Sequence, residues 1–455
     1  WRLDLGGLGG GQTGPDPSAR AGPSQLASSC FGWPPSARGL ATGMTSNLLA
    51  ALKSNQGKTS PPLVAPLIEA AKAGSVSLCA KALEEPKVKV DQKDPEGISA
   101  LMHAAQGGNL QVVSFLVEKG ARIAAKDDTG ETALMKACKD GHVDIVQYLM
   151  NAQVMQRRKI AGPLTLIGDV EMTIANEKRR VLDMKDDEGV NALMKAAEQG
   201  ESDVVRLLLD EGASPDAKDD EGWNVLMWAA LQGHEDICEM LVREPEYELA
   251  ADFCTEKGET ALMKAAANGH WGVCQLLLEE GAGVNQVDCE SQSALMWAAA
   301  EGHRQAVKGL LETRDAKVDL VSRTGKTALL LAAQFGREEI CKLLIQHGAM
   351  VNHQDAEGTT ALFGAVQAGS HALLEALIEQ RCDVELHTHR AETALMWAAK
   401  LEQLQCVEVL LAAGAKVHQQ DENGQTALDH AEGTLNSSIV DVLRQASGAQ
   451  PESPR

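Results

Sequence analysis

The chain has 455 residues and a formal net charge of -22. An acidic excess of this size argues against nucleic-acid binding, because contacts to phosphates need a basic face. Aromatic residues make up only 3% of the chain, so a core of leucine, alanine, valine and methionine is expected. No run of about 18 apolar residues is present, and no transmembrane helix is therefore predicted.

The N-terminal segment, residues 1–43, differs from the rest of the chain. It is rich in glycine, serine, proline and alanine and has no periodicity, which predicts disorder. The chain starts with Trp1, and its first methionine is Met44. The simplest interpretation is a fragment, or translated sequence upstream of the true start. The alternative is a targeting peptide, because arginine outnumbers the acids here. Residues 44–64 are the flank before the repeats.

A six-residue pattern, Ala-Leu-Met-x-Ala-Ala, recurs along the chain in close and looser copies. The copies begin at residues 100, 133, 192, 225, 261, 294, 328, 361, 394 and 427. Their spacing is 33–36 residues, except for one interval of 59, which is 33 plus an insertion of 26. A fixed period of this length predicts a stack of similar supersecondary units.

One unit, residues 127–159, illustrates the predicted structure. A turn at 127–130 is followed by Thr132, which can cap a first helix over 133–139. Asp140, Gly141 and His142 break that helix, and a second helix is predicted over 143–149. Other copies finish with Gly-Ala, which is typical of a helix C-terminus. The sequence thus predicts a repeated turn, helix, turn and helix.

The predicted array covers residues 65–447. Residues 65–90 look like a partial repeat without the opening turn, as expected of an end unit with one face in water. The last repeat carries polar changes such as Asp429, Asn436 and Ser437, which fit a C-terminal cap. Residues 448–455 form a polar tail that is predicted to be disordered.

The turn, the two antiparallel helices, the Gly-His pair between them and the Gly-Ala end resemble the ankyrin repeat. The family's first helix usually opens Thr-Pro-Leu-His-x-Ala-Ala, whereas alanine and methionine replace the proline and histidine here. The resemblance implies an all-α ankyrin-repeat solenoid of about ten helix-turn-helix repeats, with an N-terminal partial repeat and short β-turn fingers. It also implies that the histidine tie between neighbouring loops is missing and that methionine packing replaces it. The turn glycine is lost at Ser291 and Ala391, so those two fingers are expected to be distorted or more mobile.

The resemblance further implies partner binding on a concave face lined by the fingers and the first helices. The residue after Leu-Met is expected to point toward that face. In chain order, this position holds His103, Lys136, Lys195, Trp228, Lys264, Trp297, Leu331, Gly364, Trp397 and His430. We therefore predict partner contacts for the following residues, with Trp223 placed at a fingertip: Trp223, Trp228, Trp297, Trp397, Lys136, Lys195, Lys264 and His103.

Two interpretations of these residues stay open. The tryptophans can contact a partner or fill the groove between first helices, and the lysines can be ordinary solvated residues. If the lysines and tryptophans act together, an acidic and partly apolar peptide is the expected ligand.

The insertion, at about residues 153–183, is the most basic part of this acidic chain. Its cationic residues are Arg157, Arg158, Lys159, Lys178, Arg179 and Arg180. Alternation at Val170, Met172 and Ile174 around a Gly168-Asp169 turn suggests a short hairpin. Long loops in compact proteins often carry function, although a tolerated surface insertion is the competing interpretation.

Catalytic and metal-binding patterns were sought without success. The sequence has no phosphate-binding loop, no zinc-protease motif and no nucleophile elbow. Cys238, Cys274 and Cys341 share one repeat position and are expected to be small buried residues in a reducing compartment. The Gly-His histidines follow the repeat, and we expect them to stabilise loops rather than bind a metal. No cofactor is predicted.

The sequence therefore predicts a non-enzymatic scaffold or adaptor that binds a protein segment. The alternative is the regulatory ankyrin portion of a larger enzyme or channel. We expect a monomer in the cytoplasm, with the nucleus as the other compartment considered.

Overall fold

The computed structural model describes residues 66–161, 178–247, 249–434 and 436–448. The described chain is built from pairs of antiparallel helices, as the sequence predicts. The first helices of the pairs are α2 (Pro66–Lys72), α4 (Ala100–Gln106), α6 (Ala133–Lys139), α9 (Ala192–Gln199), α11 (Val225–Gln232), α13 (Ala261–Ala267), α15 (Ala294–Glu301), α17 (Ala328–Gln334), α19 (Ala361–Ala368), α21 (Ala394–Lys400) and α23 (Ala427–Glu432).

The second helix is the longer one in every pair. They are α3 (Val76–Glu84), α5 (Leu110–Glu118), α7 (Val143–Ala161), α10 (Ser202–Asp210), α12 (Glu235–Arg243), α14 (Trp271–Glu279), α16 (Arg304–Glu312), α18 (Glu338–Gln346), α20 (His371–Glu379), α22 (Leu404–Ala412) and α24 (Ser437–Ser447). No strand occurs within the described ranges; only isolated bridges close the loops between repeats. The predicted all-α solenoid of helix pairs is confirmed.

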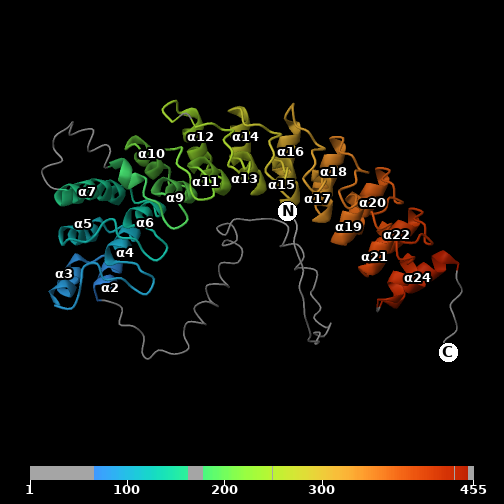
Figure 1. Cartoon of the computed structure of the whole chain (residues 1–455), viewed down its shortest axis with the longest axis horizontal. Coiled ribbons are helices and arrows are strands. Elements are labelled where there is room, and N and C mark those ends of the chain that lie inside the picture. The colour runs from blue at the N-terminus through green and yellow to red at the C-terminus, as the bar shows by residue number, and fades with distance from the viewer. Residues whose placement is uncertain (1–65, 162–177, 248, 435, 449–455) are drawn as a thin grey trace, which may run out of the picture. The chain divides into compact units, whose positions relative to one another are not determined.

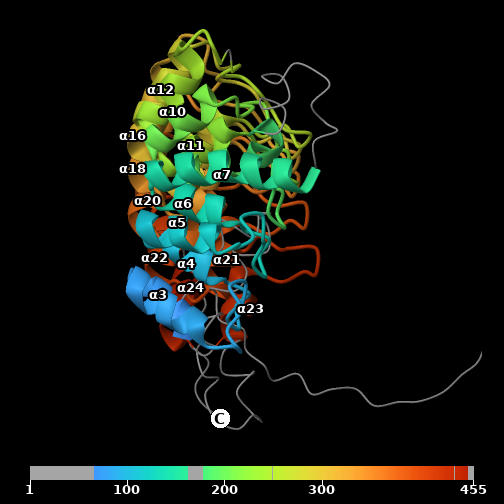
Figure 2. The ribbon, with the colours of Figure 1, turned by 90° about the vertical axis from the view of Figure 1, so that its left-hand side faces the viewer.

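The pairs stack in chain order within the unit that follows residue 63 (Figure 1). Each first helix packs on the first helices before and after it, and the second helices do the same. Figure 2 shows second helices along one side of the stack and loops along the other. None of the described helices has the length and hydropathy needed to cross a lipid bilayer.

The repeated letters of the pattern form the core between neighbours. In α6, Leu134 is 2% exposed and Met135 is 1% exposed, while Ala137 is fully buried. The small alanines let successive first helices approach closely, and the leucine and methionine side chains fill the space beside them. The predicted methionine packing is confirmed, because every methionine of the pattern is buried.

The first helices start where the sequence predicts a cap. Thr132 Oγ1 accepts a hydrogen bond of 3.3 Å from the backbone N–H of Met135. This satisfies one of the backbone donors that a helix N-terminus leaves unpaired. The same bond is made by Ser99, Asn191, Asn224, Thr260, Ser293, Thr327, Thr393 and Thr426.

The Gly-His histidines tie each helix junction to the preceding repeat. His142 Nε2 lies 2.9 Å from the carbonyl oxygen of Gln106, and His303 Nε2 lies 2.9 Å from that of Ala267. His234 and His270 make the same contact with Glu198 and Leu231. The predicted loop-stabilising role is confirmed.

The three equivalent cysteines are core residues. Cys238, Cys274 and Cys341 are completely buried, and burial raises the pKa of each thiol to about 12. A thiol with so high a pKa stays protonated near neutral pH and is a poor nucleophile. Their predicted role as small buried residues is confirmed.

The second repeat departs from the predicted unit at its second helix. The helix predicted over 143–149 continues to Ala161, so α7 takes in the first part of the insertion. Helical hydrogen bonds can continue there because no residue of the Gly-Ala type follows Met150. The hairpin predicted around residues 168–174 lies outside the described residues.

The fingers without a turn glycine do not show the predicted distortion, and the alternative of greater mobility stays a prediction. Ser291 and Ala391 adopt φ values of 57° and 58°, in the same left-handed region as the glycines elsewhere. Their backbone N–H groups still close the turn. Ser291 donates to the carbonyl oxygen of Asp288 at 2.8 Å, and Ala391 donates to that of Thr388 at 2.9 Å. The neighbouring repeats hold the finger shape, and the cost is carried as backbone strain.

Relieving this strain is expected to stabilise the array. Ala391→Gly and Ser291→Gly should each raise the free energy of unfolding by about 0.5–1 kcal/mol. The substitution removes the energetic cost of a left-handed backbone at a residue with a Cβ atom. Part of this gain is lost because glycine has more conformational entropy in the unfolded chain. Urea unfolding followed by circular dichroism measures the change. Gly358→Ala is the matched control and should destabilise, because φ is +82° and a Cβ atom would lie 3.0 Å from the backbone nitrogen of His389. A lower urea midpoint for Ala391→Gly would contradict the strain.

Candidate partner-binding face

The loops between repeats form ten fingers of six residues each. They are 94–99, 127–132, 186–191, 219–224, 255–260, 288–293, 322–327, 355–360, 388–393 and 421–426. We call the first residue of each finger its anchor. We call the variable fourth residue of Ala-Leu-Met-x-Ala-Ala, nine residues after the anchor, the register residue. The fingers and the register residues together are the finger face.

The anchor organises its own finger. Asp127 Oδ1 accepts backbone N–H bonds from Thr129 at 3.0 Å and from Glu131 at 2.9 Å. The same pair of bonds is made by Asp94, Asp186, Asp219, Asp288, Asp355 and Asp421. A short acidic side chain that accepts from the backbone two residues on is a strong turn former. One carboxylate oxygen is thereby used, and the other faces the first helix.

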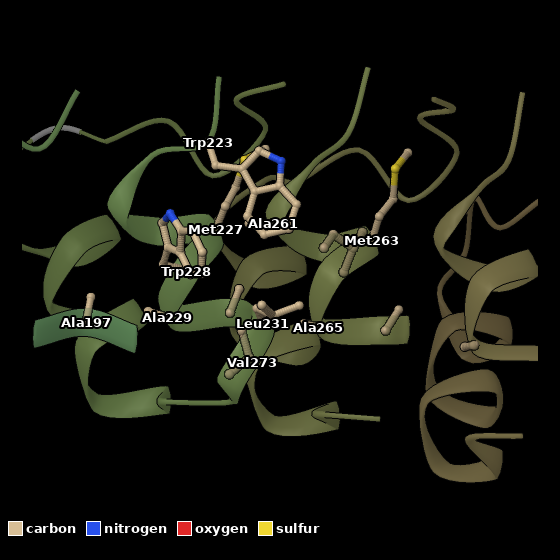
Figure 3. Packing of buried hydrophobic residues seen from close by; sticks show 14 of the residues in the cluster. Ala197, Trp223, Met227, Trp228, Ala229, Leu231, Ala261, Met263, Ala265 and Val273 are labelled. Atoms are coloured by element: carbon tan, nitrogen blue, oxygen red, sulfur yellow. The ribbon is translucent and has the colours of Figure 1, made fainter. Parts of the chain in front are cut away.

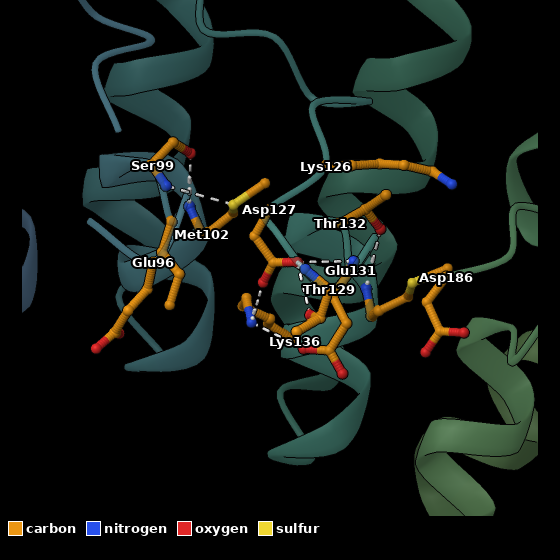
Figure 4. Close-up of polar contacts among 12 residues, drawn as sticks. Glu96, Ser99, Met102, Lys126, Asp127, Thr129, Glu131, Thr132, Lys136 and Asp186 are labelled. Carbon is orange, nitrogen blue, oxygen red and sulfur yellow. Dashed lines mark hydrogen bonds and ion pairs between the residues drawn. The ribbon is translucent and has the colours of Figure 1, made fainter. Parts of the chain in front are cut away.

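The register residue donates to that second oxygen. Lys136 Nζ lies 2.8 Å from Asp127 Oδ2 (Figure 4), and Lys195 Nζ lies 3.0 Å from Asp186 Oδ2. His103 Nε2 lies 2.8 Å from an oxygen of Asp94. The predicted contact residues His103, Lys136 and Lys195 are therefore bonded within their own repeats.

Two of these pairs merge into one buried network. Glu131 lies 2.8 Å from Lys136 Nζ and 3.2 Å from Lys195 Nζ, so it joins neighbouring repeats. Burial alone would lower the pKa of Lys136, but the hydrogen bonds that it donates to Asp127 and Glu131 outweigh burial and raise the pKa. Burial would likewise raise the pKa of Asp127, and the bond from Lys136 holds it below its usual value.

Indoles replace cations in the middle of the array. Trp228 Nε1 donates to Asp219 Oδ2 at 3.0 Å, and Trp297 Nε1 donates to Asp288 Oδ2 at 3.2 Å. An indole N–H brings no positive charge, so burial dominates and raises the pKa of both carboxyl groups. These two fingers thus carry carboxylates that are bonded but not neutralised.

Where the anchor is not aspartate, the register residue changes partner or loses its donor. Lys264 Nζ and Trp397 Nε1 each turn to a glutamate five residues earlier, at 2.8 Å and 3.0 Å. Leu331 follows the serine anchor Ser322 and has no donor to offer. One aspartate anchor also lacks a donor at the register position: the register residue of Asp355 is Gly364, and the second oxygen of Asp355 accepts from Thr359 Oγ1 at 2.7 Å instead.

The tryptophan predicted at a fingertip is buried. Trp223 lies on the returning arm of its finger and is 1% exposed (Figure 3). Its Nε1 donates to Glu259 in the next finger at 3.0 Å, and Lys264 Nζ lies 4.0 Å from its ring centroid. Trp228 packs beside it and is 5% exposed. Neither indole presents a surface to a partner in this arrangement, because both are buried.

Trp297 and Trp397 keep a half-exposed surface on the finger face. The ring of Trp397 packs edge-on against Phe363, with a centroid distance of 5.2 Å. Their partner contacts stay predictions. The lysine stripe, in contrast, does not present free charge: Lys136, Lys195 and Lys264 are all paired with carboxylates. The predicted acidic ligand for this stripe is therefore not favoured.

The structure describes the side chains of only some of the basic residues of the insertion. Arg157, Arg158 and Lys159 lie in the α7 helix, and their side chains fall outside the described set. Lys178 forms an ion pair with Glu211, and Arg179 lines a shallow depression beside Tyr247. Arg180 is also engaged within the chain. In the part of the chain that the structure describes, no cluster of histidine, cysteine or acidic residues is arranged to hold a metal ion.

A second set of bonds joins the fingers to one another. The N–H of the residue after each anchor donates to the carbonyl of the preceding finger, as from Asp187 to Thr129 at 3.1 Å. We call each such bond a rung. Rungs connect eight of the nine pairs of neighbouring fingers among the described residues. The loops are thus tied by backbone bonds, although the family's histidine tie is absent.

The family model for ankyrin repeats matches residues 67–158, 168–251, 247–322, 313–388 and 363–454. The chain belongs to the ankyrin-repeat family. Ankyrin repeats are general protein–protein interaction modules and are typically not enzymes. No curated protein matches the chain.

The anchor pairs are the feature of this ankyrin array that inspection of single repeats missed. The signal was present in the sequence: a lysine, histidine or tryptophan stands nine residues after an aspartate in six repeats. In the repeat with the serine anchor Ser322, the residue nine positions later is Leu331. The variable letter is thus coupled to its own finger, which a comparison of register residues alone does not reveal.

The buried network predicts a large cost for losing one cation. Lys136→Leu should lower the free energy of unfolding by about 3 kcal/mol, because the Asp127 and Glu131 carboxylates stay buried with less compensation. Lys400→Leu, at an exposed lysine 3.7 Å from Glu392, should cost less than about 1 kcal/mol. Urea unfolding of both variants measures the contrast.

Two further measurements test the cause. Adding Asp127→Ser to Lys136→Leu copies the Ser322 and Leu331 combination and should recover most of the loss. The loss should also shrink below about pH 4, since carboxylates with lowered pKa values stabilise the fold above their unfolded pKa and cease to do so as pH falls through the folded pKa. Equal losses near pH 7 and near pH 3 would argue for lost packing instead.

Proposed function

We propose that this ankyrin array is a non-enzymatic scaffold or adaptor that binds a protein segment on its finger face. The observation that supports the proposal is that different residues of each finger hold its structure and face solvent. Anchors and register residues are bonded inside the array, whereas the two residues after the anchor are exposed in nearly every finger. The finger's own bonds use the backbone of these tip residues, so most of their side chains are free to differ.

The tips do differ from one finger to the next. Asp187 and Glu188 are acidic, Glu256 and Lys257 are mixed, and Arg390 follows His389 in a later finger. Rungs and anchors hold these side chains at fixed places, so little entropy is lost when a partner binds. Trp297 and Trp397 add half-exposed aromatic surface to the same face, and tryptophan is a favoured interface anchor.

The alternative function, a regulatory portion of a larger enzyme or channel, would use the same face with the partner in the same polypeptide. The two functions therefore share their contact residues and differ only in what is bound.

Alanine substitution of the half-exposed indoles tests the proposal. Partners are captured from native lysate with the full chain, identified by mass spectrometry and titrated in purified form. Trp297→Ala and Trp397→Ala should weaken binding about tenfold or more, as expected of interface tryptophans.

Trp271→Ala is the matched control for this test. Trp271 is also half-buried but starts α14, a second helix, where it packs over Gly309. The control should leave affinity unchanged, with folding of all variants checked by circular dichroism. Equal affinity of the Trp297, Trp397 and Trp271 variants for every partner would place the binding surface elsewhere.

A further inference from the structure

The residue just before each anchor forms a continuous row along the finger bases. In chain order the row holds Lys93, Lys126, Lys185, Lys218, Cys254, Val287, Val321, Gln354, His387 and Gln420. We call it the base row. Lys93 Nζ donates to the carbonyl of Lys126 at 2.6 Å, and Lys126 Nζ donates to that of Lys185 at 2.6 Å. These bonded members therefore lie side by side, and backbone bonds from Cys289 to Lys257 and from Arg323 to Glu290 join the three fingers that follow Cys254, Val287 and Val321.

The chemistry of the base row changes at its fifth member. Cys254 is exposed, Val287 is 40% exposed and Val321 is 45% exposed. We call these three residues the apolar strip. Their side chains cannot make the bond that the lysines make. Lys218, the last lysine, turns away and places Nζ 4.6 Å from the ring centroid of Phe253.

The backbone carbonyls of the strip lack the donors that their counterparts have. Lys126, Lys185, Lys218 and His387 each receive a side-chain donor from the preceding row member. Within the described residues, no side chain donates to the carbonyls of Cys254, Val287 or Val321. Exposed apolar side chains beside carbonyls without a side-chain donor leave both kinds of contact for a ligand to make.

The strip starts where two fingers have parted. The junction between fingers 219–224 and 255–260 is the one pair of described neighbours without a rung. A Cβ atom on Gly222 would find its nearest neighbour, Thr255, at 3.7 Å, whereas one on Gly189 would meet the next finger's backbone nitrogen at 2.6 Å. The three extra residues of the 36-residue interval precede this junction.

The distance between neighbouring residues of the strip matches one backbone conformation of a bound segment better than another. Packed helices lie about 8–10 Å apart, which sets the distance between equivalent residues of neighbouring repeats. A polyproline II segment advances about 9 Å in three residues, so every third side chain falls on the next repeat. An extended β-strand, whose side chains on one face recur about every 7 Å, does not match this spacing.

We infer that the apolar strip of Cys254, Val287 and Val321 binds a polyproline II segment of a protein partner with an apolar residue at every third position. Lysine or arginine between the apolar residues supplies donors for the open carbonyls, and the net charge of -22 attracts such a basic segment. This inference rests on the proposed function, and it names the conformation and chemistry of the partner.

A synthetic peptide tests the inference directly. The probe is a fluorescein-labelled peptide of four Leu-Pro-Lys units, and its comparison peptide has the same composition with the leucines placed together. Fluorescence anisotropy with the full chain should show binding of the periodic peptide about tenfold tighter than that of the comparison peptide. Equal affinity for the two peptides would show charge attraction alone and overturn the inference.

Matched aspartate variants locate the site. Val287→Asp and Val321→Asp should each weaken binding of the periodic peptide about tenfold. Leu401→Asp is the control, because Leu401 is also 45% exposed but lies between α21 and α22, at the far end of the first helix from the fingers. It adds the same charge and should leave affinity unchanged. Equal weakening by all three variants would overturn the placement on the strip.

The same variants separate this inference from the function on which it depends. If captured partners are lost with Trp297→Ala but retained with Val287→Asp and Val321→Asp, the strip is not their site and the scaffold function stands. If neither set of substitutions affects partner binding, both fail. Thermal unfolding of each variant checks that the fold is intact, which the exposure of both valines leads us to expect.

Discussion

The buried carboxylate at the start of a finger is the interaction on which the rest of the face depends. One oxygen of Asp127 fixes the finger by accepting two backbone N–H groups, and the other fixes the first helix through Lys136. A single side chain thus sets the angle between loop and helix in its repeat. Because a buried carboxylate is costly without partners, the register residue or the finger itself must supply a donor, as Thr359 does for Asp355, or the anchor must change. Ser322 with Leu331 is the apolar solution to the same constraint.

This constraint determines which residues of the finger face are available to contact a ligand. Eight of the ten register residues differ between repeats and are still bonded to carboxylates inside the array, so a partner is not required to explain their variation. The exposed tips, the two half-exposed indoles and the base row remain to contact a ligand. Rungs and histidine contacts at the two ends of the first helices hold this surface in place. A repeat array owes its stability to such contacts between neighbours.

The fourth and fifth repeats are where this regular scheme changes. Trp223 fills the space between their fingers. Its Nε1 donates to Glu259 of the following repeat, and Lys264 of that repeat lies over its ring. Burial outweighs the attraction of Glu259 and lowers the pKa of Lys264, so this contact is a less favourable place for charge than the network around Lys136. The missing rung, the end of the lysine row and the start of the apolar strip all fall at this one junction.

The sequence by itself determined the array, its repeat boundaries, the caps at positions such as Thr132 and the core letters, because each depends on residues close together in one repeat. It did not determine that Trp223 is buried, since that depends on Glu259 and Lys264 in the next repeat. Nor did it determine that Ala391 keeps the glycine conformation, which neighbouring repeats impose. Tertiary structure decided these points because contacts between repeats outweigh the local preferences of a single loop.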